Sequence, residues 1–404
     1  MKKIICILLM LTVVISVIFS RPSLSYGKIP DMDAVSAGNT AGLSLTSKAA
    51  ILMEASTGKV IFEQNADEVL SPASITKIMT LILIFEAIDE GKLDYEDMVT
   101  TSEHAKSMGG SQVFLETGEQ QTVETMIKCI IIASGNDASV AMAEHIAGSE
   151  EEFVRRMNEK AASLGMTNTV FKDCCGLYDT MDHHSTARDV ALMSRELLVK
   201  HPEIKNYTKI WMENITHVTA KGSSEFTLSN TNRLIKQYEW ATGLKTGSTS
   251  LAKYCLSATA MKDGVELIAV VMAAPDYKVR FAEAVTLLNY GYNAVSLYED
   301  ALADMPETVG ISGGTRDTVP LMKPDAFRYV CTGDEKAENI TRQYNLPEKI
   351  KAPVEEGQVL GSADYYLNGN KIGSVELKAC KKVSKASYID YFKKICYKYI
   401  IIED

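Results

Sequence analysis

Three short polar motifs constrain this fold most, because their side chains can act together only if distant segments of the chain meet in one cleft. The motifs are Ser-Ile-Thr-Lys at 74–77, Ser-Gly-Asn at 134–136 and Lys-Thr-Gly at 245–247. Each is weak alone, since such short words occur by chance in long chains. In this order they supply a serine with an adjacent base, a hydroxyl that can relay a proton and a cationic strand edge. Together they predict an acyl-transfer site that requires no metal, no histidine and no cofactor.

The first motif pairs a nucleophile with its base. Ser74 and Lys77 lie three residues apart at the predicted start of a helix, so both side chains project from one face. A serine hydroxyl is a poor nucleophile until an adjacent base takes its proton. Lys77 can be that base when neutral, and burial together with a second cation, for which Lys245 is the candidate, would lower its pKa. The helix N-terminus would also favour negative charge on the Ser74 oxygen.

The second motif lies in a predicted break between two helices, where Gly135 lets the backbone turn sharply. Ser134 can relay a proton to a leaving amine. Asn136 can hold Lys77 in place and bind a substrate amide. Alone, these residues would indicate a simple loop, just as Ser74 and Lys77 alone would indicate a capped helix with a surface lysine.

The third motif lies on a predicted strand. Lys245 and Thr246 offer hydrogen-bond donors to a substrate carboxylate. Gly247 has no side chain, so an extended substrate could pair along the strand edge. The oxyanion of the reaction would then lie between the backbone N–H groups of Ser74 and Ser248.

The hydrophobic pattern predicts an α/β chain of the α+β type, in which strands precede and follow a block of helices. Strands are expected at 49–53, 60–63, 242–249, 254–261 and 265–273, and helices from 72, within 122–147, and at 151–164, 186–198 and 278–294. Ser71 is expected to cap the first helix, with Pro72 at its first position. The apolar run from Ile78 to Phe85 predicts a helix buried on nearly all sides. The sheet is expected to be antiparallel, with a tight turn at 262–264.

The N-terminal segment is typical of an exported protein. Lys2 and Lys3 precede an uncharged apolar run from Ile4 to Phe19, and small residues follow, which predicts a signal peptide at 1–27. The run is shorter than the ~20 residues of a usual spanning helix, although a retained anchor is the alternative. A flexible lead-in is expected at 28–45 and a catalytic domain at 46–298.

The C-terminal part differs in composition from the rest. Alternating runs and many turn residues predict a small all-β domain at 305–382, with a hairpin at 365–373. Residues 387–404 predict a basic amphipathic helix suited to a membrane interface. Its apolar face would carry Ile389, Phe392, Ile395, Cys396, Tyr399 and Ile400, opposite Lys394 and Lys398. A helix packed on the protein's own surface is the alternative.

Composition excludes some partners. The chain has 404 residues and a formal net charge of −10, which argues against nucleic acid as the main partner. One of its eight cysteines, Cys6, lies in the predicted signal peptide, which leaves an odd number. The cysteines are scattered, so we interpret most of them as small core residues.

With its three motifs, the chain resembles the D-alanyl-D-alanine carboxypeptidases, which are low-molecular-mass penicillin-binding proteins of peptidase family S11. The resemblance extends over nearly everything after the signal peptide. It is supported by Ser-Gly-Asn-Asp-Ala-Ser-Val-Ala-Met-Ala at 134–143, Asn-Thr-Asn-Arg-Leu at 230–234 and Gly-Leu-Lys-Thr-Gly at 243–247. It implies a β-lactamase/transpeptidase-like domain, followed by the small β domain and the terminal helix.

The resemblance also implies residue roles and a location. Ser74 would be the acyl-enzyme nucleophile and Lys77 its base, and Ser134, Asn136 and Lys245 would be supporting polar groups. Arg280 falls where the family has an arginine near the substrate's terminal carboxylate. Some members have a histidine directly after Lys-Thr-Gly, where this chain has Ser248. The substrate would be the peptidoglycan stem pentapeptide, and β-lactam antibiotics would be covalent inhibitors. The enzyme would lie at the outer face of the cytoplasmic membrane or in the cell wall, held peripherally by its terminal helix.

Three other classes of protein remain as alternatives. A class A β-lactamase commonly has a Glu-x-x-Leu-Asn motif, and this motif is absent between Asn136 and Lys245. The segment 196–200, Glu-Leu-Leu-Val-Lys, does not match it. Penicillin should therefore acylate Ser74 and leave slowly. A metal hydrolase could use the zinc-ligand types at 174–175 and 183–184, two cysteines and two histidines, but their spacing matches no standard zinc motif. A non-catalytic wall-binding protein would retain Ser74 and Lys77 without a purpose.

Overall fold

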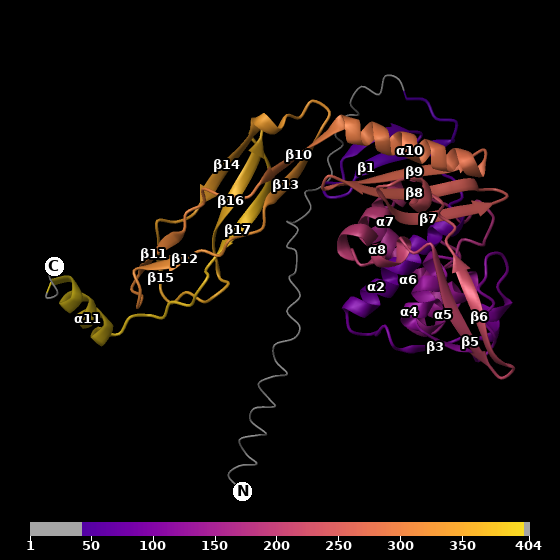
Figure 1. Ribbon diagram of the computed structural model, residues 1–404, viewed down its shortest axis with the longest axis horizontal. Helices are drawn as coiled ribbons and strands as arrows, with labels where there is room; N and C mark the ends of the chain where they lie inside the picture. The colour runs from indigo at the N-terminus through magenta and orange to yellow at the C-terminus, as the bar shows by residue number, and fades with distance from the viewer. Residues whose placement is uncertain (1–42, 400–404) are drawn as a thin grey trace, which may run out of the picture. The chain divides into compact units, whose positions relative to one another are not determined.

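The computed structural model describes residues 43–399, so the predicted signal peptide at 1–27 and most of the lead-in lie outside the described residues (Figure 1). The chain divides into two compact units. One contains residues 36–305 and 325–340, and the other contains 306–324 and 341–404. The three motifs all belong to the first unit.

A five-stranded antiparallel sheet forms the frame of the first unit, with strand order β2-β1-β9-β8-β7. Its strands are β1 (Ala49–Glu54), β2 (Val60–Gln64), β7 (Ala241–Thr249), β8 (Lys253–Lys262) and β9 (Val265–Ala274). All five predicted strands are therefore confirmed to within about one residue. The turn between β8 and β9 has positive φ at Asp263 (50°) and Gly264 (80°), as a two-residue hairpin turn requires.

Side-chain alternation along the sheet separates two hydrophobic cores. On one face, Ile51 and Val270 belong to a core shared with the helical block. On the other face, Leu52 and Val271 pack with the long helix α10 (Tyr277–Ala294). Figure 1 shows α10 along one side of the sheet, with α7 and α8 on the other side. The predicted layered α+β arrangement is confirmed.

The helical block carries the first two motifs. It contains η1 (Ala73–Thr76), α2 (Lys77–Asp89), α3 (Glu103–Ser107), α4 (Val123–Ile131), α5 (Asn136–Ala147), α6 (Glu150–Ser163), α7 (Ala187–Lys200), α8 (Ile204–Thr208) and α9 (Leu234–Gln237). Helix α2 is buried on nearly all sides, as its apolar run predicts. Helices α4 and α5 are separated at Gly135, the predicted break.

The predicted start of the first helix is wrong in detail. Ser71 is not its cap: the N-cap is Pro72, and no side chain caps the turn. The chain enters as a 3₁₀ turn, and Ala73 has a φ of 48°, in the left-handed region that is costly for a residue other than glycine. Two antiparallel strand pairs in this unit were not anticipated from the sequence. They are β3 (Met98–Thr100) with β4 (Gln120–Thr122), and β5 (Met212–Thr219) with β6 (Gly222–Ser229).

Residues after α10 are rich in short strands. In the first unit β10 (Val295–Asp300) pairs with β13 (Phe327–Thr332), and η2 (Ala337–Asn339) follows. The second unit contains β11 (Thr308–Ser312), β12 (Thr318–Pro320), β15 (Lys349–Lys351), β16 (Val359–Leu367) and β17 (Asn370–Lys378), with β14 (Ile340–Asn345) beginning at its boundary. The hairpin expected at 365–373 is present, and its turn has positive φ at Asn368 and Gly369.

The second unit ends in helix α11 (Tyr388–Tyr399). Within this unit the Lys394 amine donates to the Gly314 carbonyl at 3.0 Å and pairs with Asp317. Five apolar or aromatic side chains of α11 are exposed: Tyr388 (95%), Ile389 (67%), Tyr391 (47%), Phe392 (68%) and Ile395 (57%). None of the helices between residues 43 and 399 combines the length and apolarity that a membrane crossing needs.

Candidate active site

Ser74 lies on a turn against which two other segments pack closely. Each of these segments has a glycine at the point of contact. Ser74 is half-buried, whereas its neighbours in η1 are buried. A Cβ on Gly176 would lie 1.9 Å from the Ala73 carbonyl oxygen, and a Cβ on Gly247 would lie 3.0 Å from the Ser74 backbone nitrogen. Glycine at both positions therefore lets the loop after Cys175 and strand β7 close against the backbone that carries Ser74.

Lys77 is fully buried directly behind Ser74. Its Nζ lies 3.1 Å from the Ser74 Oγ, 2.6 Å from the Asn136 Oδ1 and 2.7 Å from the Cys175 carbonyl oxygen. Burial lowers the pKa of Lys77, although the negative charge of nearby acidic groups acts the other way. No ion pair among the described residues includes this amine.

The three partners of Lys77 can receive hydrogen bonds from a charged amine, and they also accommodate a neutral one. The Asn136 oxygen and the Cys175 carbonyl can only accept hydrogen bonds, and a neutral amine has two N–H groups to donate to them. In the charged form Lys77 donates to the Ser74 Oγ, and in the neutral form its remaining lone pair can accept the proton of the Ser74 hydroxyl. The Asn136 amide is oriented for this, because its Nδ2 donates to the Gly109 carbonyl at 2.7 Å. The arrangement can therefore remove the Ser74 proton.

A second buried amine lies on the other side of the site. The Lys245 Nζ lies 2.8 Å from the Ser134 Oγ and 3.0 Å from the Thr246 carbonyl oxygen. Burial lowers the pKa of Lys245, and the charges of Lys77 and Arg280 act in the same direction. Ser134 has a φ of 61°, and this left-handed turn precedes the start of α5 at Asn136.

Strand β7 brings the third motif to the site from the edge of the sheet. The Thr246 hydroxyl donates to the Thr231 Oγ1 at 2.7 Å, so this donor already has a partner within the chain. Ser248, the next residue after the motif, is exposed. Gly247, the residue before Ser248, lies close to the backbone of Ser74. The backbones of Ser248 and Ser74 therefore belong to two segments that pack against each other.

Arg280 lies behind β7 and is 8% exposed. Its Nη1 donates to the Gly247 carbonyl at 3.1 Å and to the Cys255 carbonyl at 3.3 Å. Its Nε is buried without a hydrogen-bond partner. Burial lowers the pKa of Arg280. This residue is therefore a buried cation beside the Lys-Thr-Gly strand, and not the surface member of a salt bridge.

The structure does not bring the four residues of the metal alternative together as a set of ligands. Cys174 and Cys175 are buried free thiols. The His183 ring already has two partners, because Nε2 lies 2.8 Å from the Thr76 hydroxyl and Nδ1 accepts from the Lys172 N–H. In the described part of the chain, three or more ligand-type side chains converge only at Asp89, His201 and Glu203, which includes none of these four.

Sequence reasoning missed four contributors to the site. The carbonyls of Cys175 and Gly109 act through the backbone, so their residue types carry no signal. Gly176 is recognisable only from the close approach of Ala73. Thr231 lies in the motif at 230–234, for which the sequence predicted no separate role.

Comparison with known proteins agrees with this geometry. The family model "D-alanyl-D-alanine carboxypeptidase" matches residues 34–276, and the model "Penicillin-binding protein 5, C-terminal domain" matches residues 295–385. The chain is 42% identical over 358 residues to D-alanyl-D-alanine carboxypeptidase DacF of Bacillus subtilis, which covers 88% of this chain and 90% of the relative. It is 36% identical to D-alanyl-D-alanine carboxypeptidase DacC of Escherichia coli, over 85% of this chain and 86% of that relative.

Solved structures give the same result. Penicillin binding protein 5 of Haemophilus influenzae superposes with a TM-score of 0.64 and 30% identity, covering 86% of this chain and all (100%) of that one. PBP3 of Streptococcus pneumoniae, described as a peptidoglycan synthesis regulatory factor, gives a TM-score of 0.68 and 26% identity, over 85% of this chain and 100% of that one.

Proposed function

The chain belongs to the D-alanyl-D-alanine carboxypeptidase family, peptidase family S11, and on that premise we propose that Ser74 is the nucleophile that removes the terminal D-alanine from peptidoglycan stem pentapeptides. It is a serine-type carboxypeptidase of the penicillin-binding class. The observation that carries the residue assignment is the convergence of Ser74, Asn136 and Cys175 on the buried Lys77 amine.

Acylation begins with proton transfer from Ser74 to Lys77. The Ser74 oxygen then attacks the carbonyl carbon of the penultimate D-alanine, and a C–O bond forms as the carbonyl becomes an oxyanion. The backbone N–H groups of Ser74 and Ser248 are the proposed donors to that oxygen.

Departure of D-alanine requires a proton on its nitrogen. Ser134 is the proposed relay, since its hydroxyl lies 2.8 Å from the Lys245 amine, which can replace the proton that it gives away. The C–N bond then breaks and leaves the tetrapeptide on Ser74 as an ester. The proton that Lys77 took from Ser74 would then pass through Ser134 to Lys245, which restores the neutral Lys77 amine. Water attacks the ester with Lys77 again as base, and Lys77 gives the proton of that water to the Ser74 oxygen as the ester C–O bond breaks and the tetrapeptide leaves.

The substrate's terminal carboxylate needs cationic or hydroxyl donors. The proposed carboxylate donors are Lys245 and Thr246 of strand β7 and Arg280 of helix α10. They place two buried cations and a hydroxyl beside the same strand, because Arg280 donates to the Gly247 carbonyl. Rotation of the Thr246 hydroxyl from Thr231 to the substrate would supply its hydrogen bond. Asn136 is proposed to bind a substrate amide while it holds Lys77.

The test is mass spectrometry of the protein after exposure to benzylpenicillin, with Ser74→Ala alongside. We expect a covalent adduct of one antibiotic molecule on the wild type, mapped to the peptide that contains Ser74, and no adduct on the variant. Release of D-alanine from a synthetic stem pentapeptide should disappear in the same variant. An adduct that persists in Ser74→Ala would refute the assignment of the nucleophile.

Slow release of the antibiotic separates this function from that of a β-lactamase. Among the described residues, no carboxylate has a hydrogen bond to Ser74, Lys77, Ser134 or Asn136; the neighbouring Asp137 carboxylate instead accepts from the backbone N–H groups of Val113 and Leu115. We therefore propose that the penicilloyl ester persists for minutes or longer. Rapid turnover of benzylpenicillin would favour the β-lactamase alternative.

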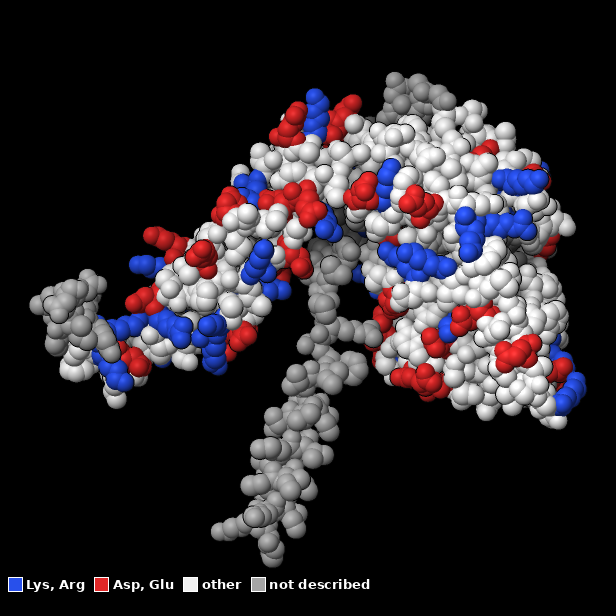
Figure 2. Space-filling model, viewed as in Figure 1, with Lys and Arg blue, Asp and Glu red and all other residues white. Residues whose placement is uncertain are grey.

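We also propose that the protein is exported and that α11 lies in the membrane interface. The exposed aromatic and aliphatic side chains of α11 have the composition of an interfacial helix. Lysines precede them at Lys381, Lys382 and Lys385. Figure 2 shows blue side chains gathered where α11 joins its unit, while both signs of charge are mixed elsewhere on that face. Such lysines would be attracted to anionic headgroups.

A further inference from the structure

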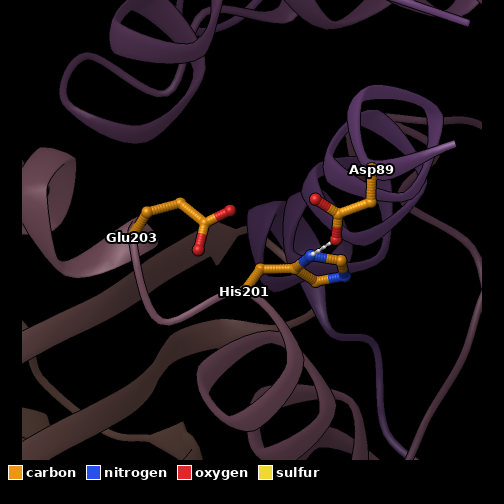
Figure 3. Close-up of side chains that lie close together, drawn as sticks. All are labelled: Asp89, His201 and Glu203. Atoms are coloured by element: carbon orange, nitrogen blue, oxygen red, sulfur yellow. Dashed lines mark ion pairs between the residues drawn. The ribbon is translucent and has the colours of Figure 1, made fainter. Parts of the chain in front are cut away.

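Away from the proposed active site, three ligand-type side chains meet at the junction of three helices. Asp89 is the last residue of α2, His201 is the C-cap of α7 and Glu203 is the N-cap of α8. One ligand atom from each residue lies within 4.8 Å of the other two. Figure 3 shows the Asp89 carboxylate and the His201 ring nitrogen facing each other, with the Glu203 carboxylate turned toward the same space.

The His201 ring is the buried member of this cluster. Its side chain is 4% exposed, and it stacks on Phe85 with ring centroids 5.6 Å apart and planes 24° apart. Its Nδ1 lies 3.0 Å from the Asp89 Oδ2, yet Nδ1 has no partner in hydrogen-bonding geometry. A buried polar atom without a hydrogen bond is uncommon in a native protein. The nitrogen is therefore held beside a carboxylate but is not satisfied by it.

The donor set has the chemistry of a divalent transition-metal site. One imidazole nitrogen and two carboxylates are common ligands of Zn²⁺, which lies ~2.0–2.2 Å from such atoms, so two ligands of one ion stand roughly 3–3.5 Å apart. The separation of 3.0 Å between Nδ1 and Oδ2 agrees with that spacing. Asp89 is exposed and Glu203 is half-buried, so the ion could enter from solvent and keep a water molecule as a further ligand. The two carboxylates would balance its double charge.

We propose that Asp89, His201 and Glu203 form a structural site for Zn²⁺ or a similar borderline divalent cation. The ion would fasten the end of α2 to the segment that joins α7 and α8. Helix α2 begins at Lys77, and α8 supports β7, because the Thr208 hydroxyl donates to the Thr242 carbonyl and a Cβ on Gly243 would lie 2.9 Å from Thr208. The site therefore links the far end of the Lys77 helix to the support of the strand that carries Lys245.

Zinc binding to the full-length chain tests this proposal. The protein is stripped with a chelator, the half-buried thiols Cys380 and Cys396 are replaced by serine to prevent binding there, and ZnSO₄ is titrated by calorimetry. We expect one ion per chain and a thermal unfolding midpoint that rises with zinc. The double variant Asp89→Asn with Glu203→Gln should bind at least ten-fold more weakly, and zinc should no longer raise its unfolding midpoint.

Two further variants keep the test decisive. Glu203→Gln alone should fold, since Glu203 makes no capping hydrogen bond, and it should already weaken binding. His104→Gln is the matched control, because His104 lies 3.0 Å from one carboxylate, that of Glu150, on the exposed surface; it should bind zinc as the wild type does. The proposal fails if the wild type binds no zinc, or if the double variant binds it as tightly as the wild type does. Because the readouts are binding and stability, the result is independent of the carboxypeptidase reaction.

Discussion

The Asn136 amide oxygen lies 2.6 Å from the Lys77 amine, while the other end of the same amide is held by the Gly109 carbonyl. The amide therefore accepts a hydrogen bond from Lys77 without offering it a negative charge. A carboxylate at this position would stabilise the charged lysine, which cannot act as a base. On the proposed roles, asparagine at this position leaves Lys77 with a hydrogen-bond partner and lets it take the Ser74 proton.

Asn136→Asp should therefore raise the pKa of Lys77 and slow acylation at neutral pH. The neutral fraction of the amine falls roughly ten-fold for each unit by which the pKa rises. We expect the rate of benzylpenicillin adduct formation, measured from pH 6 to 10, to shift to higher pH in this variant. Asn206→Asp, the same change at an exposed residue of α8, should leave the profile in place. An unshifted profile in Asn136→Asp would mean that Lys77 is not the base.

The two buried lysines should make the stability of the folded protein increase with pH. The pKa values of Lys77 and Lys245 are both lowered from 10.5 in the folded chain. Between each folded pKa and 10.5 the unfolded chain holds a proton that the folded chain lacks, so raising the pH favours folding. The stability that this difference adds to the fold is fully present above pH 10.5, and it is lost as the pH falls through the folded pKa values. The slope is at most about 1.4 kcal/mol per pH unit for each lysine.

Denaturant unfolding at several pH values between 7 and 10 checks this dependence. Lys77→Met combined with Lys245→Met should remove the increase. Lys323→Met with Lys349→Met, at two exposed lysines, is the control and should preserve it. An equal slope in the buried-lysine variant and the wild type would show that other groups cause the dependence.

Gly176 should be indispensable for acylation, because its Cβ would collide with the Ala73 carbonyl. Gly176→Ala should push the Ser74 turn away from Lys77 and reduce the acylation rate by at least ten-fold. Gly165→Ala is the matched control: Gly165 has a φ of 75°, against 77° for Gly176, but nothing lies within 4 Å of its Cβ position. Both variants carry the cost of a positive φ, about 1–2 kcal/mol, so thermal unfolding should shift in both. Only Gly176→Ala should lose activity.

Helix α11 should bind vesicles through its exposed apolar side chains. Ile389→Asp with Phe392→Asp should reduce co-sedimentation of the full-length chain with anionic lipid vesicles by at least ten-fold, because each side chain contributes roughly 1.5–3 kcal/mol when fully buried. Met322→Asp, at an exposed methionine elsewhere in the same unit, should not change it. Equal sedimentation of the two proteins would indicate that α11 packs on protein and not on lipid.

The sequence predicted the elements whose pattern is strong. The apolar run of α2, the Asp263–Gly264 turn and the break at Gly135 all have local signatures, and each is present. The role of Ser71 was mispredicted because a serine before a proline normally indicates a capped α-helix, whereas packing of β7 against η1 imposes a 3₁₀ turn with a strained Ala73. Local propensity cannot register a constraint that comes from a strand far along the chain.

The candidate site divides in the same way. Side chains that act through their own functional groups, such as Ser74 and Lys245, could be chosen from motifs. The carbonyls of Cys175 and Gly109 could not, since every residue has one and only the fold decides where it points. The cluster of Asp89, His201 and Glu203 was missed because Asp89 is separated from the other two by most of the helical block.

Lys245 lies in the interior with a hydroxyl and a carbonyl as its partners and with two other cations acting against its charge. An apolar side chain of similar length would suit that position better as a matter of packing alone. Exchange of this amine for methionine should therefore yield a chain that survives higher temperatures and does not process its substrate. Lys245 would then lower the stability of the fold in exchange for activity, so a variant with a higher melting temperature need not be a better enzyme.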